Sequence, residues 1–448
     1  MSYGLPQTCY ASIGDISIAY QVLGEGPIDI IVVPGIISHV EFFHEIPGYT
    51  EFLRSLSQIG RVITFDKRGQ GLSERISGAP SMDERIDDIA AVMEAANSKS
   101  AAFVTLSEGG ALSILFAATY PERVSHLFIC GGYAMGHGTD DYPFRQSKEE
   151  RIAKSELWAS NWGKGIAWDF ITPSIANNTG MREVFGRAER LSCTPSGMKH
   201  FFELNILADV RPVLDLVKAP TVIFHAKGDR QVPFEAGQHL AEHIENARLV
   251  LLEGDDHMIW AGDYDRCIEE IKEACAQETQ GYIVSQRAFA TVLFTDIVKS
   301  TEQLKILGDE QWRKLLDQHD QYAHELIHRF QGRLIKSTGD GVLATFDSPG
   351  RAIQCSSLLV EKISQLGIAI RVALHAGEIE KRGEDISGLA VHVTARILEF
   401  SGSEEVVSSR LVADLVAGSR EFSFETIGVH SLKDIDGNYE LLKVVPGG

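Results

Sequence analysis

The chain has 448 residues, which is long for one domain and predicts two or three. Hydrophobic residues make up 44% of it and charged residues 23%, as in ordinary globular proteins. The formal net charge of −20 argues against a protein that binds nucleic acid, although a local basic pocket for a nucleotide remains compatible with it.

The sequence predicts a soluble protein of the cytoplasm. No run approaches 18 apolar residues, so we expect no membrane span. The stretch Met1–Pro6 lacks the basic and apolar regions of a signal peptide. The six cysteines are scattered without the spacing of zinc ligands, which is typical of reduced, mostly buried thiols.

The first part of the chain alternates between strand and helix patterns. Apolar, β-branched runs at 28–33, 61–65 and 101–106 predict buried strands, and helical spacing follows over 82–96. Strands that alternate with helices predict βαβ units. We therefore expect a parallel sheet with helices on both faces.

Three loops that each follow a predicted strand carry a serine, an aspartate and a histidine, in that order. Ser107 lies between the strand at 101–106 and an apolar helix, the strand–turn–helix setting of a nucleophile elbow. Asp229 and His257 each follow a later predicted strand. This order along the chain is that of α/β-hydrolases.

With these residues and the loop Asp66-Lys-Arg-Gly-Gln-Gly-Leu-Ser, the chain resembles the α/β-hydrolase family over roughly residues 10–275. The resemblance implies that Ser107 is the nucleophile, His257 the general base and Asp229 the carboxylate that orients the histidine.

The same resemblance implies further parts of a hydrolase site. The oxyanion donors would be the backbone N–H groups of Glu108 and Ile36, and a helical cap would cover the pocket over about residues 137–210. Thr105 stands where the family usually has glycine, two residues before the serine, and this weighs against catalysis but not against the fold. The alternative is a module that binds an unknown small-molecule ligand or mediates dimerisation.

A polar, glycine-containing stretch at 277–287 predicts a short linker. We therefore predict a hydrolase-like domain over 1–276 and a second domain over 288–448. The second domain alternates strands and helices in a pattern that suggests a ferredoxin-like α+β fold.

Two carboxylates in the second domain lie where predicted strands end or turn. Asp296 closes the apolar run that starts at residue 288, and Asp340 precedes Gly341 in an expected hairpin turn. The separation of 340 − 296 = 44 residues leaves room for a long helical connection between neighbouring strands. Two such carboxylates can hold divalent metal against a polyphosphate, although Asp340-Gly341 alone is a common turn.

Taken together, five motifs resemble those of the class III nucleotide cyclases, over essentially all of 288–448. They are Phe294-Thr-Asp-Ile297, Lys336-x-x-Gly-Asp-Gly-Val-Leu-Ala-Thr-Phe346, His375-Ala-Gly-Glu378, Asp385-Ile-x-Gly388 and the helix that ends in Arg396.

The resemblance implies that Asp296 and Asp340, assisted by the Ile297 carbonyl, bind two Mg²⁺ or Mn²⁺ ions per active site. Lys336 and Asp385 would read the base. A carboxylate accepts a hydrogen bond from the adenine N6 amine and a lysine donates one to N1, whereas guanine presents the opposite pattern. The implied substrate is therefore ATP.

Three further residues take roles by the same resemblance. Arg396 would stabilise charge on the phosphoryl group in the transition state, and Lys433 would hold the triphosphate. His392 stands four residues before Arg396, where many members carry an asparagine that steadies the ribose. We expect this change to alter the rate more than to abolish the reaction.

The family builds each site from two subunits, which implies a homodimer. The predicted function is an adenylate cyclase that forms 3′,5′-cyclic AMP and pyrophosphate, regulated by the hydrolase-like domain. The alternative is an esterase-type serine hydrolase whose second domain senses a nucleotide.

Overall fold

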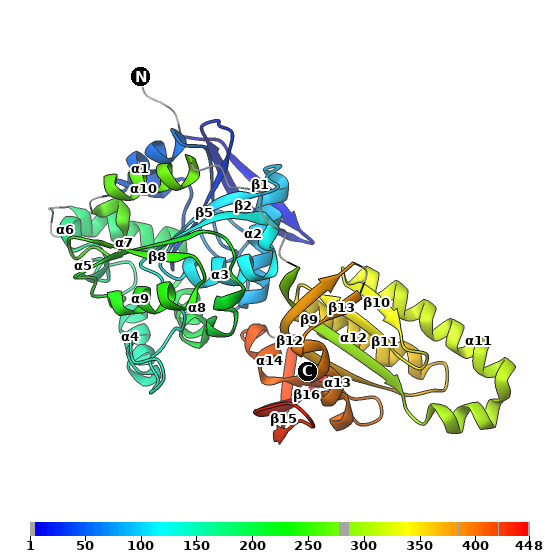
Figure 1. Cartoon of the computed structure of the whole chain (residues 1–448). Coiled ribbons are helices and arrows are strands. Elements are labelled where there is room, and N and C mark those ends of the chain that lie inside the picture. Colours follow the sequence, from blue (N-terminus) through cyan, green and yellow to red (C-terminus); the bar gives the residue numbers. More distant parts are fainter. Residues whose placement is uncertain are drawn as a thin grey trace. The chain divides into compact units, whose positions relative to one another are not determined.

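The contacts of the chain divide it into two compact units, Met1–Ser285 and Gln286–Gly448 (Figure 1). The computed structural model describes residues 5–176, 178, 180–262, 264–276, 286–383, 385–419 and 421–446. Most of the predicted linker, residues 277–285, lies outside the described residues.

The first unit is built on one sheet, with strand order β1-β2-β4-β3-β5-β6-β7-β8. The strands are β1 (Thr8–Ile13), β2 (Ile16–Leu23), β3 (Asp29–Val33), β4 (Arg61–Phe65), β5 (Ala101–Leu106), β6 (Val124–Cys130), β7 (Thr221–Ala226) and β8 (Ala247–Leu252). Strands β3 to β8 are parallel, as the alternating pattern predicts.

The alternating pattern begins only at residue 28, and the two strands that precede it are not parallel to their neighbours. β1 pairs antiparallel with β2, and β2 pairs antiparallel with β4. Only Gly14 and Asp15 separate β1 from β2, and a connection of two residues can join antiparallel strands but not parallel ones.

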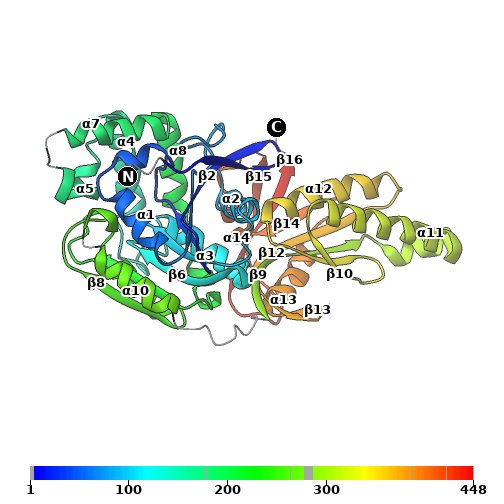
Figure 2. The same ribbon diagram turned by 90° about the horizontal axis from the view of Figure 1, so that it is seen from above.

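Helices cover both faces of this sheet (Figures 1 and 2). Side chains of α1 (Tyr49–Ser57) and α10 (Asp265–Ala276) share one apolar core with alternate residues of the central strands. On the opposite face lie α2 (Met82–Ala95), α3 (Gly109–Thr119) and α9 (Phe234–His243). Every residue of α3 is buried, which explains its apolar sequence on all sides.

The chain between β6 and β7 forms the helical region that the resemblance places over the pocket. Its helices are α4 (Lys148–Ser160), α5 (Trp168–Ile171), α6 (Pro173–Ala176), α7 (Met181–Ser192) and α8 (Pro195–Leu207). Ser147 caps α4 and Thr194 caps α8 by accepting hydrogen bonds from backbone N–H groups in the first turn, so the sequence itself marks where these helices begin.

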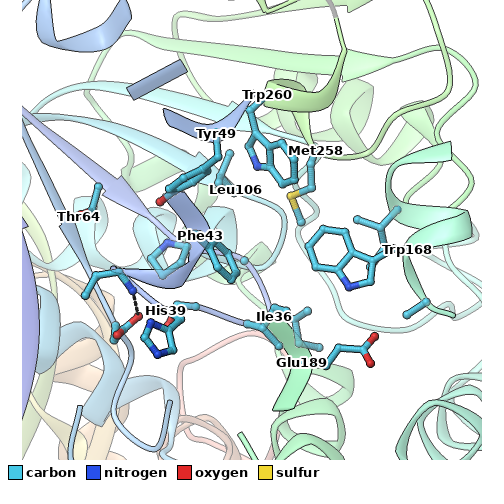
Figure 3. Close-up of a pocket in the computed structure, with 18 of the residues that line it drawn as sticks. Ile36, His39, Phe43, Tyr49, Thr64, Leu106, Trp168, Glu189, Met258 and Trp260 are labelled. Atoms are coloured by element: carbon cyan, nitrogen blue, oxygen red, sulfur yellow. Dashed lines mark hydrogen bonds between the residues drawn. The ribbon is translucent and has the colours of Figure 1, made fainter. Parts of the chain in front are cut away.

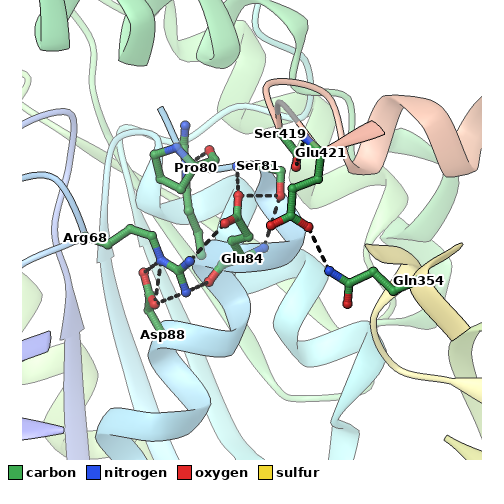
Figure 4. A network of polar contacts seen from close by, with 9 residues as sticks. Arg68, Pro80, Ser81, Glu84, Asp88, Gln354, Ser419 and Glu421 are labelled. Atoms are coloured by element: carbon green, nitrogen blue, oxygen red, sulfur yellow. Dashed lines mark hydrogen bonds and ion pairs between the residues drawn. The ribbon is translucent and has the colours of Figure 1, made fainter. Parts of the chain in front are cut away.

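The loop after β4 is held by buried charges. The carboxylate of Asp66 accepts hydrogen bonds from the N–H groups of Val40, at 3.0 Å, and Leu72, at 2.8 Å. Arg68 pairs with Asp88 on α2, with a shortest distance of 2.6 Å, and with Glu84, at 3.0 Å (Figure 4). Burial raises the pKa of Asp88 to about 6 even though Arg68 lies beside it.

The second unit is a sheet with strand order β10-β11-β9-β12-β14-β16-β15, and β13 pairs with β12. The strands are β9 (Arg287–Ile297), β10 (Arg333–Ser337), β11 (Val342–Phe346), β12 (Ile370–Arg382), β13 (Asp385–Ser387), β14 (Val406–Ser409), β15 (Phe422–Ser431) and β16 (Asn438–Pro446). β9 lies between β11 and β12 and carries the first of the two predicted metal carboxylates near its end.

In the described residues of this unit, the α-helices beside the sheet are α11 (Ser300–Arg329), α12 (Pro349–Ser364), α13 (Leu389–Ile397) and α14 (Arg410–Leu415). α11 bends at Gly308, whose φ of 74° is non-helical. His319 on α11 is fully buried, as expected for a core histidine. Among all the helices in the described part of the chain, none is long and apolar enough to cross a membrane.

The buried Arg68–Asp88 pair provides a test of this fold. Arg68→Ala leaves Asp88, whose side chain is 1% exposed, without its cation, so we expect a loss of about 3–5 kcal/mol in the free energy of unfolding of the first unit. The measurement is urea denaturation followed by tryptophan fluorescence. Arg182→Ala is the control, because that arginine is 54% exposed and its pair with Asp169 contributes at most about 1 kcal/mol. An equally small loss for Arg68→Ala would contradict the expectation.

Candidate active sites

The turn between β5 and α3 holds Ser107 in a strained conformation. Its φ is 54°, in the left-handed region that residues other than glycine rarely adopt. The Ser107 N–H donates to the carbonyl of Cys130 at 2.8 Å. A Cβ atom at Gly109 would lie 2.8 Å from the carbonyl oxygens of both Val33 and Pro34, so the start of α3 packs directly on the backbone after β3. This is the geometry of a nucleophile elbow.

Thr105 is accommodated in this turn. Its side chain is fully buried, and its hydroxyl oxygen lies 3.7 Å from where a Cβ atom at Gly110 would be. The close approach of α3 to the sheet therefore depends on Gly109 and Gly110 and tolerates a threonine on the strand. The departure from the family pattern at Thr105 does not prevent the elbow from forming.

The three residues of the expected triad lie together. Ser107 Oγ lies 2.8 Å from His257 Nε2, and His257 Nδ1 lies 2.7 Å from Asp229 Oδ2. This geometry fits an imidazole that carries its proton on Nδ1 and accepts the serine hydroxyl at Nε2. All three residues are buried.

Asp229 is held in place as an anion. Its Oδ1 accepts hydrogen bonds from the N–H groups of Gln231, at 2.8 Å, and Val232, at 3.0 Å. Burial favours a raised pKa for this carboxyl, but His257 and His225, which lie beside it, outweigh burial and lower the pKa below its usual value. Asp229 therefore stays ionised at neutral pH and can stabilise an imidazolium at His257.

A mainly apolar cavity lies beside the elbow, with an empty volume of about 670 Å³ (Figure 3). Tryptophans 158, 162 and 168 from the helical region line it, so this region covers the pocket. On the other side lie Leu106 from β5 and Met258 beside the histidine. Such walls suit an apolar or aromatic group.

A second cavity, of about 360 Å³ empty volume, is lined by Ser107 and His257 themselves. It shares the wall residues Ile36 and Met258 with the first cavity. Ile36 and Glu108, whose backbone N–H groups are the expected oxyanion donors, both line it. Ser107 therefore faces a cavity that shares part of its wall with the apolar one.

In the second unit, Asp296 and Asp340 are brought to neighbouring segments. The N–H of Ile297 donates to the carbonyl of Asp340 at 2.7 Å. A Cβ atom at Gly341 would lie 1.9 Å from the carbonyl oxygen of Thr295, so only glycine allows this approach. The Asp-Gly pair thus does more than turn the chain, since it brings the backbone at Asp340 against the strand end that carries Asp296.

The donor set at this point fits a hard divalent cation. Asp296 Oδ2 accepts from Arg371, with a shortest distance of 2.6 Å, and Asp340 Oδ2 accepts from the Ser300 hydroxyl at 2.9 Å. The Oδ1 atom of each carboxylate has no hydrogen-bond partner within the described part of the chain. Carboxylate and carbonyl oxygens, here with Ile297, are the ligands that Mg²⁺ and Mn²⁺ prefer. Groups of three or more His, Cys, Asp or Glu side chains suited to a metal do not occur among the described residues.

The two side chains that are expected to read the base also meet. Lys336 Nζ lies 2.9 Å from both carboxylate oxygens of Asp385, although the residues are 49 positions apart in sequence. The hydrogen bond from Lys336 lowers the pKa of Asp385, which is exposed. A donor and an acceptor are therefore adjacent on the surface of one chain.

Arg396 belongs to a third group. Its Nε donates to the Lys433 carbonyl at 3.2 Å, and its Nη atoms lie 3.2 Å from Glu399 and 3.6 Å from Asp434. His392 is exposed one turn earlier on α13. No hydrogen bond or ion pair in the described ranges joins this group to Asp296 and Asp340 or to the Lys336–Asp385 pair.

Several charged residues at these sites have no signal in the sequence. Arg371 lies opposite Asp296 in the β9–β12 register, which only strand pairing reveals. Lys67 forms a buried ion pair with Glu108, the residue after the nucleophile. Arg145 and Arg151 reach the second cavity from the helical region. The pattern of apolar residues carries no information about these long-range pairings.

Comparison with known proteins finds relatives of two kinds, hydrolases and adenylate cyclases. The model of the alpha/beta hydrolase fold family matches residues 30–261. The serine hydrolase BPHL of Mus musculus is 23% identical over 272 residues, which cover 58% of this chain and 84% of that protein. The esterase EaEST of Exiguobacterium antarcticum has 19% identity and a TM-score of 0.53, and covers 60% of this chain and 99% of its own, which shows the fold alone.

An adenylate cyclase of Streptomyces coelicolor is 25% identical over 130 residues. The match covers 29% of this chain and 34% of that protein, so the chain spans about one third of the length of this relative.

The triad geometry predicts selective labelling of Ser107. A fluorophosphonate probe should attach to the Ser107 hydroxyl, because His257 can remove its proton, and Ser107→Ala should abolish labelling. Asp229→Asn should slow labelling by about 10²- to 10⁴-fold, since the imidazole loses the anion that orients it. Intact-mass spectrometry measures the adduct.

The control for this labelling is Ser113→Ala, which removes a buried hydroxyl that bonds within α3 and should leave labelling unchanged. Equal labelling of the wild-type protein and the Ser107→Ala variant would show that the probe reacts elsewhere.

Proposed function

The chain belongs to the alpha/beta hydrolase fold family, and we propose that it joins a unit of this fold to an adenylate cyclase, which converts ATP to 3′,5′-cyclic AMP and pyrophosphate. The observation that carries the proposal is the meeting of Asp296 and Asp340 in a unit that also pairs Lys336 with Asp385. The similarity to an adenylate cyclase supports the proposal. That match covers 29% of the chain, and the second unit, with 448 − 285 = 163 residues, is long enough to contain it.

Adenine recognition would use the Lys336–Asp385 pair. In the free protein each partner satisfies the other, at 2.9 Å. An adenine ring that enters between them can replace this bond with two of its own, because its N6 amine donates to the carboxylate and its N1 accepts from the ammonium. Guanine would place a carbonyl against Asp385 and an N–H against Lys336, and the unpaired groups would exclude it.

Asp296, Asp340 and the Ile297 carbonyl would hold the Mg²⁺ or Mn²⁺ ions. When bound, two such ions lower the pKa of the ribose 3′-hydroxyl and neutralise charge on the triphosphate. Arg371 balances the charge of Asp296 in the free protein through its hydrogen bonds to Oδ2 and leaves Oδ1 for a ligand.

Arg396 would stabilise charge at the phosphorus during in-line displacement, and Lys433 would hold the triphosphate. The Arg396 guanidinium is oriented by the Lys433 carbonyl and by Glu399. His392, one turn earlier, would hydrogen-bond the ribose. As in the nucleotide cyclases that the sequence resembles, the proposed site would be completed by a second copy of the chain in a homodimer.

Subunit complementation tests this arrangement. Asp296→Ala and Lys336→Ala should each be inactive with Mn²⁺ and ATP, because each removes an element from both sites of its homodimer. After subunit exchange, half of the dimers are heterodimers with one intact site of two, so about one quarter of the wild-type rate should return. Cyclic AMP formation is the measurement.

Two checks make this experiment decisive. Different affinity tags on the two variants demonstrate that heterodimers form, and Asp309→Ala, an exposed carboxylate on α11, should keep the wild-type rate. Demonstrated heterodimers without recovered activity would refute the shared site.

We propose a second activity for the first unit, that of an esterase-type serine hydrolase, and the observation that favours it is the connected triad. Ser107 Oγ would attack the ester carbonyl while His257 takes the hydroxyl proton, and the N–H groups of Glu108 and Ile36 would stabilise the oxyanion. The alcohol leaves with the proton from His257. Water, activated by the same histidine, then releases the acid and restores the serine.

We further propose that the first unit regulates the cyclase. Covalent modification of Ser107 by the fluorophosphonate should change the rate of cyclic AMP formation by at least about twofold, because an occupied pocket shifts the population of active dimers. Ser107→Ala, which cannot be modified at this position, should show no response to the probe. An unchanged rate at complete labelling of the wild-type protein would refute the coupling.

A further inference from the structure

The second cavity of the first unit contains two buried arginines that the triad does not use. Arg145 and Arg151 line it together with Ser107 and His257. Arg145 is 8% exposed and Arg151 is 3% exposed. Arginine is almost never this deeply buried unless it is paired.

Neither guanidinium has an acidic partner. In the part of the chain that the structure describes, no Asp or Glu oxygen lies within ion-pair distance of either, and Arg145 Nη1 and Arg151 Nε have no hydrogen-bond partner. Their contacts are with aromatic faces, since Arg145 lies 4.0 Å from the centre of the Tyr133 ring and Arg151 lies 5.4 Å from that of Phe202. Aromatic rings support a cation but do not cancel its charge.

The carboxylates nearby lie beside other cations. Glu108, which also lines the cavity, accepts from Lys67 through Oε1, and its Oε2 lies 3.9 Å from Arg85 without a hydrogen-bond partner among the described residues. Asp229 is hydrogen-bonded to His257. The buried cations Lys67, Arg85, Arg145 and Arg151 thus outnumber the two carboxylates by two.

Lys154 adds positive charge at the same place. Its ammonium donates to Gln231, a cavity residue, at 2.7 Å. Burial and the neighbouring charges of Arg151 and Arg145 lower the pKa of Lys154 to about 8. Burial and the charge of Arg145 likewise lower the pKa of Arg151 to about 9, so both groups stay protonated at neutral pH.

We propose that this cavity is a carboxylate-binding subsite, and that the ligand of the first unit is an ester with an apolar part for the tryptophan-lined cavity and a carboxylate for Arg145 and Arg151. A carboxylate accepts the free N–H groups of guanidinium in a planar, charge-assisted geometry and supplies the missing negative charge. The ester link would lie at Ser107, which lines the second cavity, and the two cavities share Ile36, Trp158, Ile171 and Met258. The ester part of this inference rests on the proposed hydrolase activity, whereas carboxylate binding does not.

A matched pair of esters tests the subsite in the full-length protein. 4-Nitrophenyl hydrogen adipate and 4-nitrophenyl hexanoate have acyl chains of the same length and differ by the terminal carboxylate. We expect the wild-type kcat/KM to be at least tenfold higher for the adipate ester. Arg151→Met and Arg145→Gln should each lower kcat/KM for the adipate ester at least tenfold and change that for the hexanoate ester by less than about threefold. Equal rates for the two esters in the wild type would overturn the proposal.

Direct binding separates the subsite from the hydrolase activity. If neither ester is cleaved, the hydrolase proposal fails, and calorimetry with monomethyl adipate and methyl hexanoate still measures the carboxylate preference. Tighter binding of monomethyl adipate, lost in Arg151→Met, supports the subsite, and equal binding overturns it. If inorganic phosphate competes for the site at a lower concentration than adipate does, the site is one for phosphate. That result would also overturn the proposal of a carboxylate subsite.

Two controls address folding and nonspecific charge. Arg151→Met keeps most of the side-chain volume and removes an unpaired buried cation, so its melting temperature without ligand should equal or exceed that of the wild type. Arg54→Gln removes an exposed arginine on α1 and should leave both esters unaffected.

Discussion

The close approach of α3 to the backbone after β3 is the constraint on which the first unit depends. Gly109 leaves no room for a side chain between the helix and the carbonyls of Val33 and Pro34. The chain can make this contact only by turning sharply after β5, which places Ser107 at a φ of 54°. The strain of one residue is outweighed by the burial of all of α3. The position of the nucleophile is therefore a consequence of packing, and a threonine on the strand does not alter it.

Buried charge sets the chemistry around that nucleophile. Asp229 is the anion that His257 needs, and its own backbone hydrogen bonds hold it in position. Beyond the triad, buried cations exceed carboxylates, and within the described residues the guanidinium groups of Arg145 and Arg151 lie against aromatic rings without an acidic partner. A protein that folds with unpaired buried charge loses stability relative to an apolar alternative. A ligand of opposite charge recovers this loss when it binds, so we interpret the arginines as binding residues.

In the second unit, each group that the proposed reaction needs has its own partners. Arg371 and Ser300 bind the carboxylates of Asp296 and Asp340, Lys336 pairs with Asp385, and Arg396 donates to the Lys433 carbonyl. Such an arrangement keeps each group ordered without substrate. In the proposed homodimer, a second copy of the chain would complete the site. Regulation through dimer geometry would then require no new residue in the site.

The sequence by itself determined most of the element types, and it indicated the three residues that meet as a triad, while the residues of the cyclase site stay a prediction. Apolar runs, the caps of α4 and α8, and the order Ser107, Asp229, His257 are local signals, because each depends on neighbouring residues and on strand or helix period. Only the tertiary structure decided that β1 and β2 are antiparallel, that Arg371 faces Asp296, and that Arg145 and Arg151 lie beside the nucleophile. These facts depend on strand register and on the packing of segments far apart in the chain. A charged residue also looks the same in a sequence whether it lies on the surface or in a buried pocket, so the sequence cannot tell the two apart.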